Sequence, residues 1–257
     1  MKKVALIFGT RPEAVKMAPV YLALKNSSLR PVVIATAQHR EMLDQVLSLF
    51  GIKPDFDLNI MQQRQSLSGL TSRLIEKLDE IYSQNKFDAT LVQGDTTSTF
   101  AGALVSFYHK IPVGHVEAGL RTANVYDPFP EEVNRRLNGV ISTYHYPPTE
   151  KSKLNLLKEG VPEENMLVTG NTVIDALLWV TSNKSRLTSS FREALGVEGD
   201  DYILVTMHRR ENWGRPMQEV MKAIKDVLNE FPRMKVVFPV DRKSTRLNSS
   251  HVSKPRM

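Results

Sequence analysis

Cysteine is missing altogether from the 257 residues of this sequence. The chain can therefore form no disulfide and no site in which thiolates bind a metal ion, which fits a reducing compartment. No apolar run approaches the roughly 20 residues that a membrane-spanning helix needs. The apolar run at the N-terminus is too short for a secretory signal, because residues 9–13 interrupt it. We therefore expect a cytoplasmic protein with no membrane partner.

Glycine motifs that bind nucleotides are also missing. Neither the dinucleotide fingerprint G-x-G-x-x-G nor a Walker loop occurs in the chain. No spacing of histidines and carboxylates is typical of a metal site either. We expect the protein to need neither a bound cofactor nor a metal ion.

The positive charge is unevenly distributed. The chain carries a formal net charge of +6, but residues 241–257 alone hold five Lys or Arg and a single Asp. The rest of the chain is close to neutral and shows no basic stripe interleaved with aromatic residues. A nucleic-acid partner is therefore not expected.

Apolar runs alternate with amphipathic segments along the chain, which is typical of an α/β protein with a parallel, doubly wound sheet. The predicted strands are residues 4–8, 31–36, 90–93, 113–117, 141–146 and 166–169, and then 202–206 and 235–240. The predicted helices include residues 43–50, 67–84, 151–159 and 216–230, and residues 52–61 read as a loop. We place a domain boundary near Gly170, after which a second doubly wound domain begins.

The turn after the first strand suits a phosphate group. Gly9 permits a tight bend, Thr10 can cap the following helix and Pro12 suits its first turn. Backbone amides at such a helix start, together with Arg11 and Lys16, would attract an anion. The alternative is that Arg11 is an ordinary surface charge.

Carboxylates follow two further strands and open a later segment. Asp95 and Glu117 each come directly after a short apolar run, and Glu131 lies in an acidic cluster soon afterwards. Carboxyl ends of parallel strands meet at the edge where open α/β sheets bind ligands, so the three segments can converge on one crevice. Asp95 and Glu117 could instead simply cap the helices that follow. For the three segments together we favour a catalytic site.

Seven segments carry a resemblance to a known family: residues 9–19, 36–42, 93–99, 114–122, 130–135, 170–177 and 208–211. Together they resemble the non-hydrolysing UDP-N-acetylglucosamine 2-epimerases, and the resemblance covers about residues 3–240. It implies a GT-B-like fold, with a complete Rossmann-like domain at residues 1–170 and the start of a UDP-binding one at 171–240. It also implies interconversion of UDP-GlcNAc and UDP-ManNAc for bacterial surface polysaccharides, usually by a homodimer.

The chemistry of that reaction explains the carboxylates. The hydrogen on C2 of the sugar is not next to a carbonyl, so the accessible route is elimination of UDP from C1 followed by re-addition. This route needs a base on one face of the sugar, an acid on the other, and cations at the departing pyrophosphate. The resemblance assigns acid/base roles to Asp95, Glu117 and Glu131, without saying which takes the proton. It makes His208 catalytic, and it places Arg11, Lys16, Arg135 and Arg209 at the substrate.

The resemblance also implies a second, regulatory substrate site at Gln38, His39 and Arg64. The alternative there is a solvated helix start. We interpret His109, His115 and His145 as structural residues rather than ligands. A GT-B glycosyltransferase, a hydrolysing epimerase and a non-catalytic binding module remain alternatives for the chain as a whole.

The resemblance stops after residue 240. Residues 241–257 are polar and lack periodicity, as disordered segments do, and they look like the translation of a sequencing adapter. We expect them to be a non-native, disordered tail, and we expect the 257-residue chain by itself to have little epimerase activity and weak UDP binding.

Overall fold

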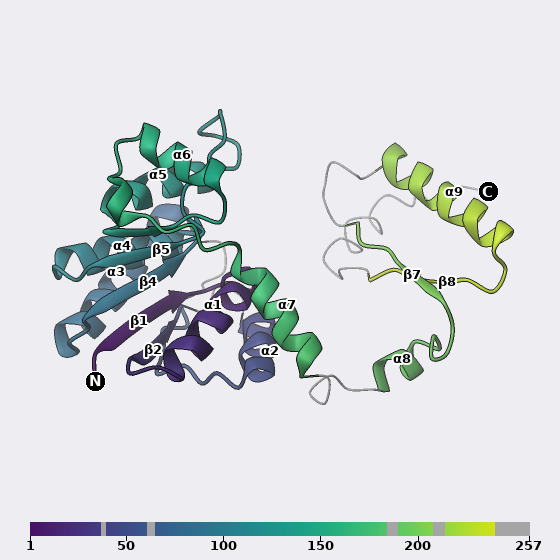
Figure 1. Ribbon diagram of the computed structural model, residues 1–257, viewed down its shortest axis with the longest axis horizontal. Helices are drawn as coiled ribbons and strands as arrows, with labels where there is room; N and C mark the ends of the chain where they lie inside the picture. The colour runs from purple at the N-terminus through teal and green to yellow at the C-terminus, as the bar shows by residue number, and fades with distance from the viewer. Residues whose placement is uncertain (37–39, 61–64, 184–189, 208–213, 240–257) are drawn as a thin grey trace, which may run out of the picture. The chain divides into compact units, whose positions relative to one another are not determined.

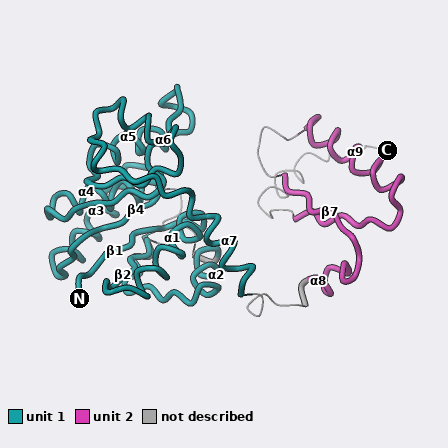
Figure 2. The backbone as a smooth tube through the Cα atoms, viewed as in Figure 1, with its two compact units in different colours: residues 1–186 teal, residues 187–257 magenta. Residues whose placement is uncertain are grey.

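A computed structural model describes residues 1–36, 40–60, 65–183, 190–207 and 214–239. The chain divides into two compact units, residues 1–186 and 187–257 (Figure 2). The predicted boundary near Gly170 therefore differs from the observed division. The reason is α7 (Thr172–Ser182), which packs against α1 (Arg11–Lys25) and so belongs to the first unit.

The first unit is built on a six-stranded parallel sheet in the order β3-β2-β1-β4-β5-β6. Figure 1 labels β2, β1, β4 and β5 of this sheet. The strand order reverses between β1 and β4, as the doubly wound pattern requires. The strands are β1 Lys3–Phe8, β2 Arg30–Ala35, β3 Phe56–Asp57, β4 Ala89–Gln93, β5 Val113–Val116 and β6 Tyr144–Tyr146.

Helices cover both faces of this sheet. Successive side chains of a strand point to opposite faces, and β1 shows this clearly. Leu6 and Phe8 pack with α1, α2 (Arg40–Phe50) and α7, whereas Ala5 and Ile7 pack with α3 (Leu67–Gln84) and α4 (Thr97–Tyr108). This double cover explains why the strands are continuous apolar runs.

The remaining helices of the first unit surround the later strands. They are α5 (Glu131–Ile141), α6 (Glu150–Lys158) and the short 3-10 turn η1 (Glu163–Asn165). None of the helices in the described part of the chain is long and apolar enough to cross a membrane.

Three predicted elements differ from the structure. The predicted loop at residues 52–61 contains β3, which is only two residues long and leaves no periodic signal. The predicted strand at residues 141–146 begins at Tyr144, because Ile141 is the last residue of α5. The predicted strand at residues 166–169 is reduced to an isolated bridge between Met166 and His145.

The second unit contains a parallel pair of strands, β7 (Tyr202–Leu204) and β8 (Lys235–Val237). It also contains α8 (Ser190–Ala194) and α9 (Arg215–Glu230). This sequence of elements follows the predicted restart of the β-α pattern. The predicted tail at residues 241–257 lies outside the described residues.

Candidate active site

The candidate site lies at the carboxyl ends of β1, β4 and β5. Ligands of open α/β sheets bind where the strand order reverses, and here that point lies between β1 and β4. The turns after these strands carry the predicted phosphate-binding segment, Asp95 and Glu117. The sheet therefore brings these three predicted segments to one edge.

Glu117 is held by three hydrogen-bond donors. Lys16 Nζ lies 2.5 Å from its Oε2, and Gln93 Nε2 donates to the same oxygen. Asn171 Nδ2 donates to Oε1 at 3.0 Å. The Glu117 side chain is only 11% exposed and that of Lys16 is 22% exposed, so solvent screens this ion pair weakly.

The backbone of Glu117 is also unusual. Its φ of 63° lies in the left-handed region, which residues other than glycine rarely adopt. Such a conformation typically costs about 1–3 kcal/mol and persists where the surrounding contacts enforce it. The carboxylate lies near the turn after β4, since a Cβ built on Gly94 would lie 3.9 Å from Glu117 Oε2.

Asp95 forms a second carboxylate–cation pair. Arg135 donates to Asp95 Oδ2 from Nε at 2.8 Å and from Nη2 at 2.6 Å. Asn134 Nδ2 donates to the Asp95 backbone carbonyl at 2.8 Å. These contacts attach the turn after β4 to α5 and place Asp95 beside Arg135.

Glu131 opens α5 and is half-buried, whereas its neighbour Glu132 is fully buried. Sequence reasoning missed Glu132. It accepts from the Thr122 amide at 3.1 Å, from Arg135 at 3.3 Å and from Arg136 at 3.0 Å. Burial opposes ionisation, but these donors outweigh it and lower the pKa of the Glu132 carboxyl. Its spacing of three and four residues from the two arginines was a signal for this role.

A second missed carboxylate is Glu13, which is 2% exposed. It completes the capping box of α1 with Thr10, and its carboxylate also contacts Thr96 in the turn after β4 and Thr99 in the first turn of α4. Arg11, the first residue of α1, is exposed. The sequence T-R-P-E carries the capping-box spacing, but the contact with the second turn is visible only in the fold.

Five predicted site residues lie outside the described residues. They are Gln38, His39, Arg64, His208 and Arg209, so both the regulatory site and the contribution of the second unit stay predictions. Among the residues that the structure does describe, no three His, Asp or Glu side chains are placed to share a metal ion.

His115 and His145 are both buried, as expected of structural residues. His115 Nε2 donates to the Gly94 carbonyl at 2.7 Å, and its Nδ1 has no partner among the described residues. Protonation of Nδ1 would bury a charge without an acceptor. Burial is accordingly the main cause that lowers the pKa of His115 to about 4. Burial also lowers the pKa of His145.

The burial of His115 should make the stability of the fold sensitive to acid. Unfolded His115 takes up a proton below its ordinary pKa of about 6.5, but folded His115 does so only near 4. The unfolded state therefore binds more protons between these values, and the free energy of unfolding should fall as the pH drops. Between about pH 7 and pH 5, the free energy of unfolding should fall by about 2 kcal/mol less in His115→Gln than in the wild-type protein. Urea unfolding of both proteins at the two pH values measures it, and an identical loss in both would contradict the assignment.

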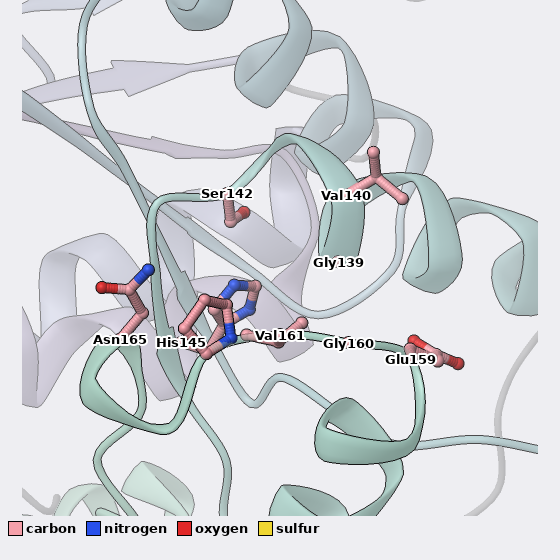
Figure 3. A pocket seen from close by; sticks show the side chains of 9 residues that line it. Gly139, Val140, Ser142, His145, Glu159, Gly160, Val161 and Asn165 are labelled. Atoms are coloured by element: carbon pink, nitrogen blue, oxygen red, sulfur yellow. The ribbon is translucent and has the colours of Figure 1, made fainter.

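A separate cavity of about 240 Å³ opens between the end of α5, β6 and the end of α6 (Figure 3). Its lining includes Ser142, His145, Glu159 and Asn165. Glu159 is already bound through both oxygens to Arg121, at 2.7 and 2.6 Å. No predicted site residue lines this cavity, so we do not assign the chemistry to it.

The comparisons with known proteins agree with the resemblance. The family described as UDP-N-acetylglucosamine 2-epimerase matches residues 22–254. The chain is 53% identical over 240 residues to the UDP-N-acetylglucosamine 2-epimerase of Bacillus subtilis (strain 168), covering 93% of this chain and 62% of that protein. It is 50% identical over 244 residues to that of Escherichia coli (strain K12), covering 93% and 65%.

A solved structure extends the comparison to the fold. The crystal structure of UDP-GlcNAc 2-epimerase from Neisseria meningitidis bound to UDP-GlcNAc matches with a TM-score of 0.82 and 48% identity. The match covers 98% of this chain and 71% of that chain. The GT-B-like, α/β fold class is thereby confirmed. The chain spans less than two thirds of the length of the Bacillus subtilis and Escherichia coli proteins. The chain belongs to the UDP-N-acetylglucosamine 2-epimerase family.

Proposed function

We propose that the full-length protein interconverts UDP-GlcNAc and UDP-ManNAc for the synthesis of bacterial surface polysaccharides. The observation that carries the proposal is the pair of carboxylates, Glu117 and Asp95, each bound to a cation at the switch point of the sheet. Membership of the family and its similarity to a relative whose structure holds UDP-GlcNAc support the substrate.

The proposed reaction is an elimination followed by a re-addition. A base takes the proton from C2, the electron pair forms the C1–C2 double bond, and the bond from C1 to the oxygen of UDP breaks. UDP then returns to C1 while a proton reaches C2 from the opposite face. All atoms are recovered, so no oxidant or cofactor is required.

The surroundings of Glu117 suit the base of this reaction. Its three neighbours donate to its oxygens and hold the carboxylate in one position, and a base needs such a fixed position to reach the C2 proton. Asp95 and Glu131 are the remaining candidates for the acid on the other face. Arg11 and Lys16 would stabilise the negative charge that develops on the departing diphosphate. The family resemblance adds His208 and Arg209 to the proposed site, and both lie outside the described residues.

We also propose that the full-length protein is a cytoplasmic homodimer that binds no nucleic acid. The absence of cysteine and the near-neutral charge of residues 1–240 support the location and the lack of a nucleic-acid partner. Large apolar side chains remain exposed on and beside α4 and α5, as a dimer surface would require. They are Phe107, Tyr108, Leu137, Val140 and Tyr144.

Turnover without an acceptor tests the proposal. The assay uses a completed protein, in which residues 1–240 are continued by the remaining part of the Bacillus subtilis relative. We expect UDP-GlcNAc alone to yield UDP-ManNAc, followed by NMR. Release of free ManNAc would indicate a hydrolysing enzyme, and a strict need for an acceptor would indicate a glycosyltransferase. Either result would contradict the proposal. The 257-residue chain alone should show little turnover in the same assay.

A further inference from the structure

Glu13 joins the turn after β1 to the turn after β4. Its Oε2 accepts from the Gly9 amide at 3.0 Å and from the Thr10 amide at 2.7 Å. Its Oε1 accepts from Thr96 Oγ1 at 2.6 Å and lies 3.0 Å from Thr99 Oγ1. A capping box needs only the bond from the Thr10 amide and the reciprocal bond from the Glu13 amide to Thr10 Oγ1. The contacts with Thr96 and Thr99 give this buried carboxylate a further role.

The two donors that share one oxygen of Glu117 lie on the elements that flank the two joined turns. Lys16 lies on α1, one turn after Glu13, and Gln93 ends β4. Both contact Glu117 Oε2. Thr99 Oγ1 also lies 2.7 Å from the Gln93 backbone carbonyl, so a continuous polar chain runs from Glu13 through Thr99 and Gln93 to Glu117.

We propose that Glu13 is a positioning residue that fixes the two turns relative to each other, so that Lys16 and Gln93 hold Glu117 in place. The inference rests on the proposed function only for its effect on turnover. Glu13 does not contact Glu117 in the hydrogen bonds described here, and it acts through the turns. A small displacement of a reacting group, about 1 Å, is enough to lower a rate about 100-fold.

Geometry rather than charge is the basis of this role, and Glu13→Gln separates the two. A glutamine can direct its carbonyl at the amides of Gly9 and Thr10, which are fixed donors. Its NH2 group would then face Thr96 and Thr99, whose hydroxyls can rotate to accept. Glu13→Ala removes the connection altogether. Thr99→Val, which keeps the side-chain shape, removes the hydroxyl that contacts both Glu13 Oε1 and the Gln93 carbonyl. It leaves the hydrogen bond from Thr96 to Glu13 in place.

The matched control is Ser106→Ala. Ser106 is equally buried and belongs to another polar network, with Tyr82 at 3.1 Å and Thr90 at 2.9 Å. That network lies among α3, α4 and β4, and its hydrogen bonds among the described residues include none to a proposed site residue. It therefore reports the effect of losing buried hydrogen bonds without disturbing the two turns.

Steady-state kinetics of the completed protein test the proposal. We expect Glu13→Ala and Thr99→Val to lower kcat at least about 10-fold with a smaller change in KM. We expect Glu13→Gln and Ser106→Ala to keep kcat within about threefold of wild type. Wild-type kcat in both Glu13→Ala and Thr99→Val would overturn the proposal. An equal loss in Glu13→Gln and Glu13→Ala would also overturn it, because charge would then be what matters.

Hydrogen exchange of the 257-residue chain separates this inference from the proposed function. We expect Thr99→Val and Glu13→Ala to speed exchange in both turns, at the Gly9 and Thr10 amides and at Gly94. Ser106→Ala should leave these amides unchanged. If the completed wild-type protein proves inactive, the proposed function fails, but hydrogen exchange still tests whether Glu13 couples the two turns. Faster exchange confined to the turn nearest the substitution would contradict this coupling.

Discussion

Glu117→Gln is expected to lower kcat of the completed protein at least about 100-fold, the usual contribution of one acid/base group. Glutamine is isosteric but cannot take a proton from C2 at neutral pH. Its NH2 group would also face one of the donors from Lys16, Gln93 or Asn171, so the site would lose a hydrogen bond. KM should change less than kcat, because the substitution removes a contribution made in the transition state.

Two further variants and a control test whether the loss of kcat is specific to the candidate site. Asp95→Asn and Glu131→Gln are expected to lose a similar factor, since all three carboxylates are proposed acid/base groups. Glu80→Gln is the matched control, because Glu80 is exposed and pairs only with Lys77 in the described contacts. It should keep wild-type turnover. Near-wild-type kcat in the three site variants would contradict the assignment of the active site.

Gly9→Ala is expected to destabilise the first unit by at least about 2 kcal/mol. A Cβ at this position would lie 1.9 Å from Thr36 Oγ1 and 2.9 Å from Ser98 Oγ. Thr36 and Ser98 are buried and hydrogen-bonded to each other at 2.8 Å, so neither side chain can move away freely. The melting temperature should fall by roughly 4–8 °C.

A double-mutant cycle tests the cause of that loss. Thr36→Ala removes the atom in closest conflict, so Gly9→Ala with Thr36→Ala should lose less stability than the sum of the two single variants. Gly69→Ala is the control, since its nearest neighbour is Ser66 Oγ at 3.2 Å and a helix favours alanine. It should stay within about 1 kcal/mol of wild type. Simple additivity in the cycle would mean that the close approach is not the cause.

Local signals made much of the fold predictable. α3 was predicted at residues 67–84 and lies at Leu67–Gln84, because Ser66 caps it and its apolar residues recur at helical spacing. The strands β1 and β4 were recognisable because both sheet faces are covered. By contrast, β3 has two residues and depends on pairing with β2 rather than on its own sequence.

The candidate site was predictable only in part. Asp95 and Glu117 follow apolar runs, so their place at the sheet edge could be read from the sequence. The partners of the site residues could not, because they come from distant segments. Asn171 reaches Glu117 across 54 residues, and Thr99 reaches Glu13 across 86. The left-handed backbone of Glu117 carried no signal either, since glycine is the residue that usually marks it.

The most direct test of the proposed reaction is to run it in D2O. The completed protein is incubated with UDP-GlcNAc, and the product is examined by NMR. Removal of the C2 proton and its return from solvent predict UDP-ManNAc that carries deuterium at C2. UDP-ManNAc that retains the original hydrogen at C2, or no UDP-ManNAc at all, would contradict the account.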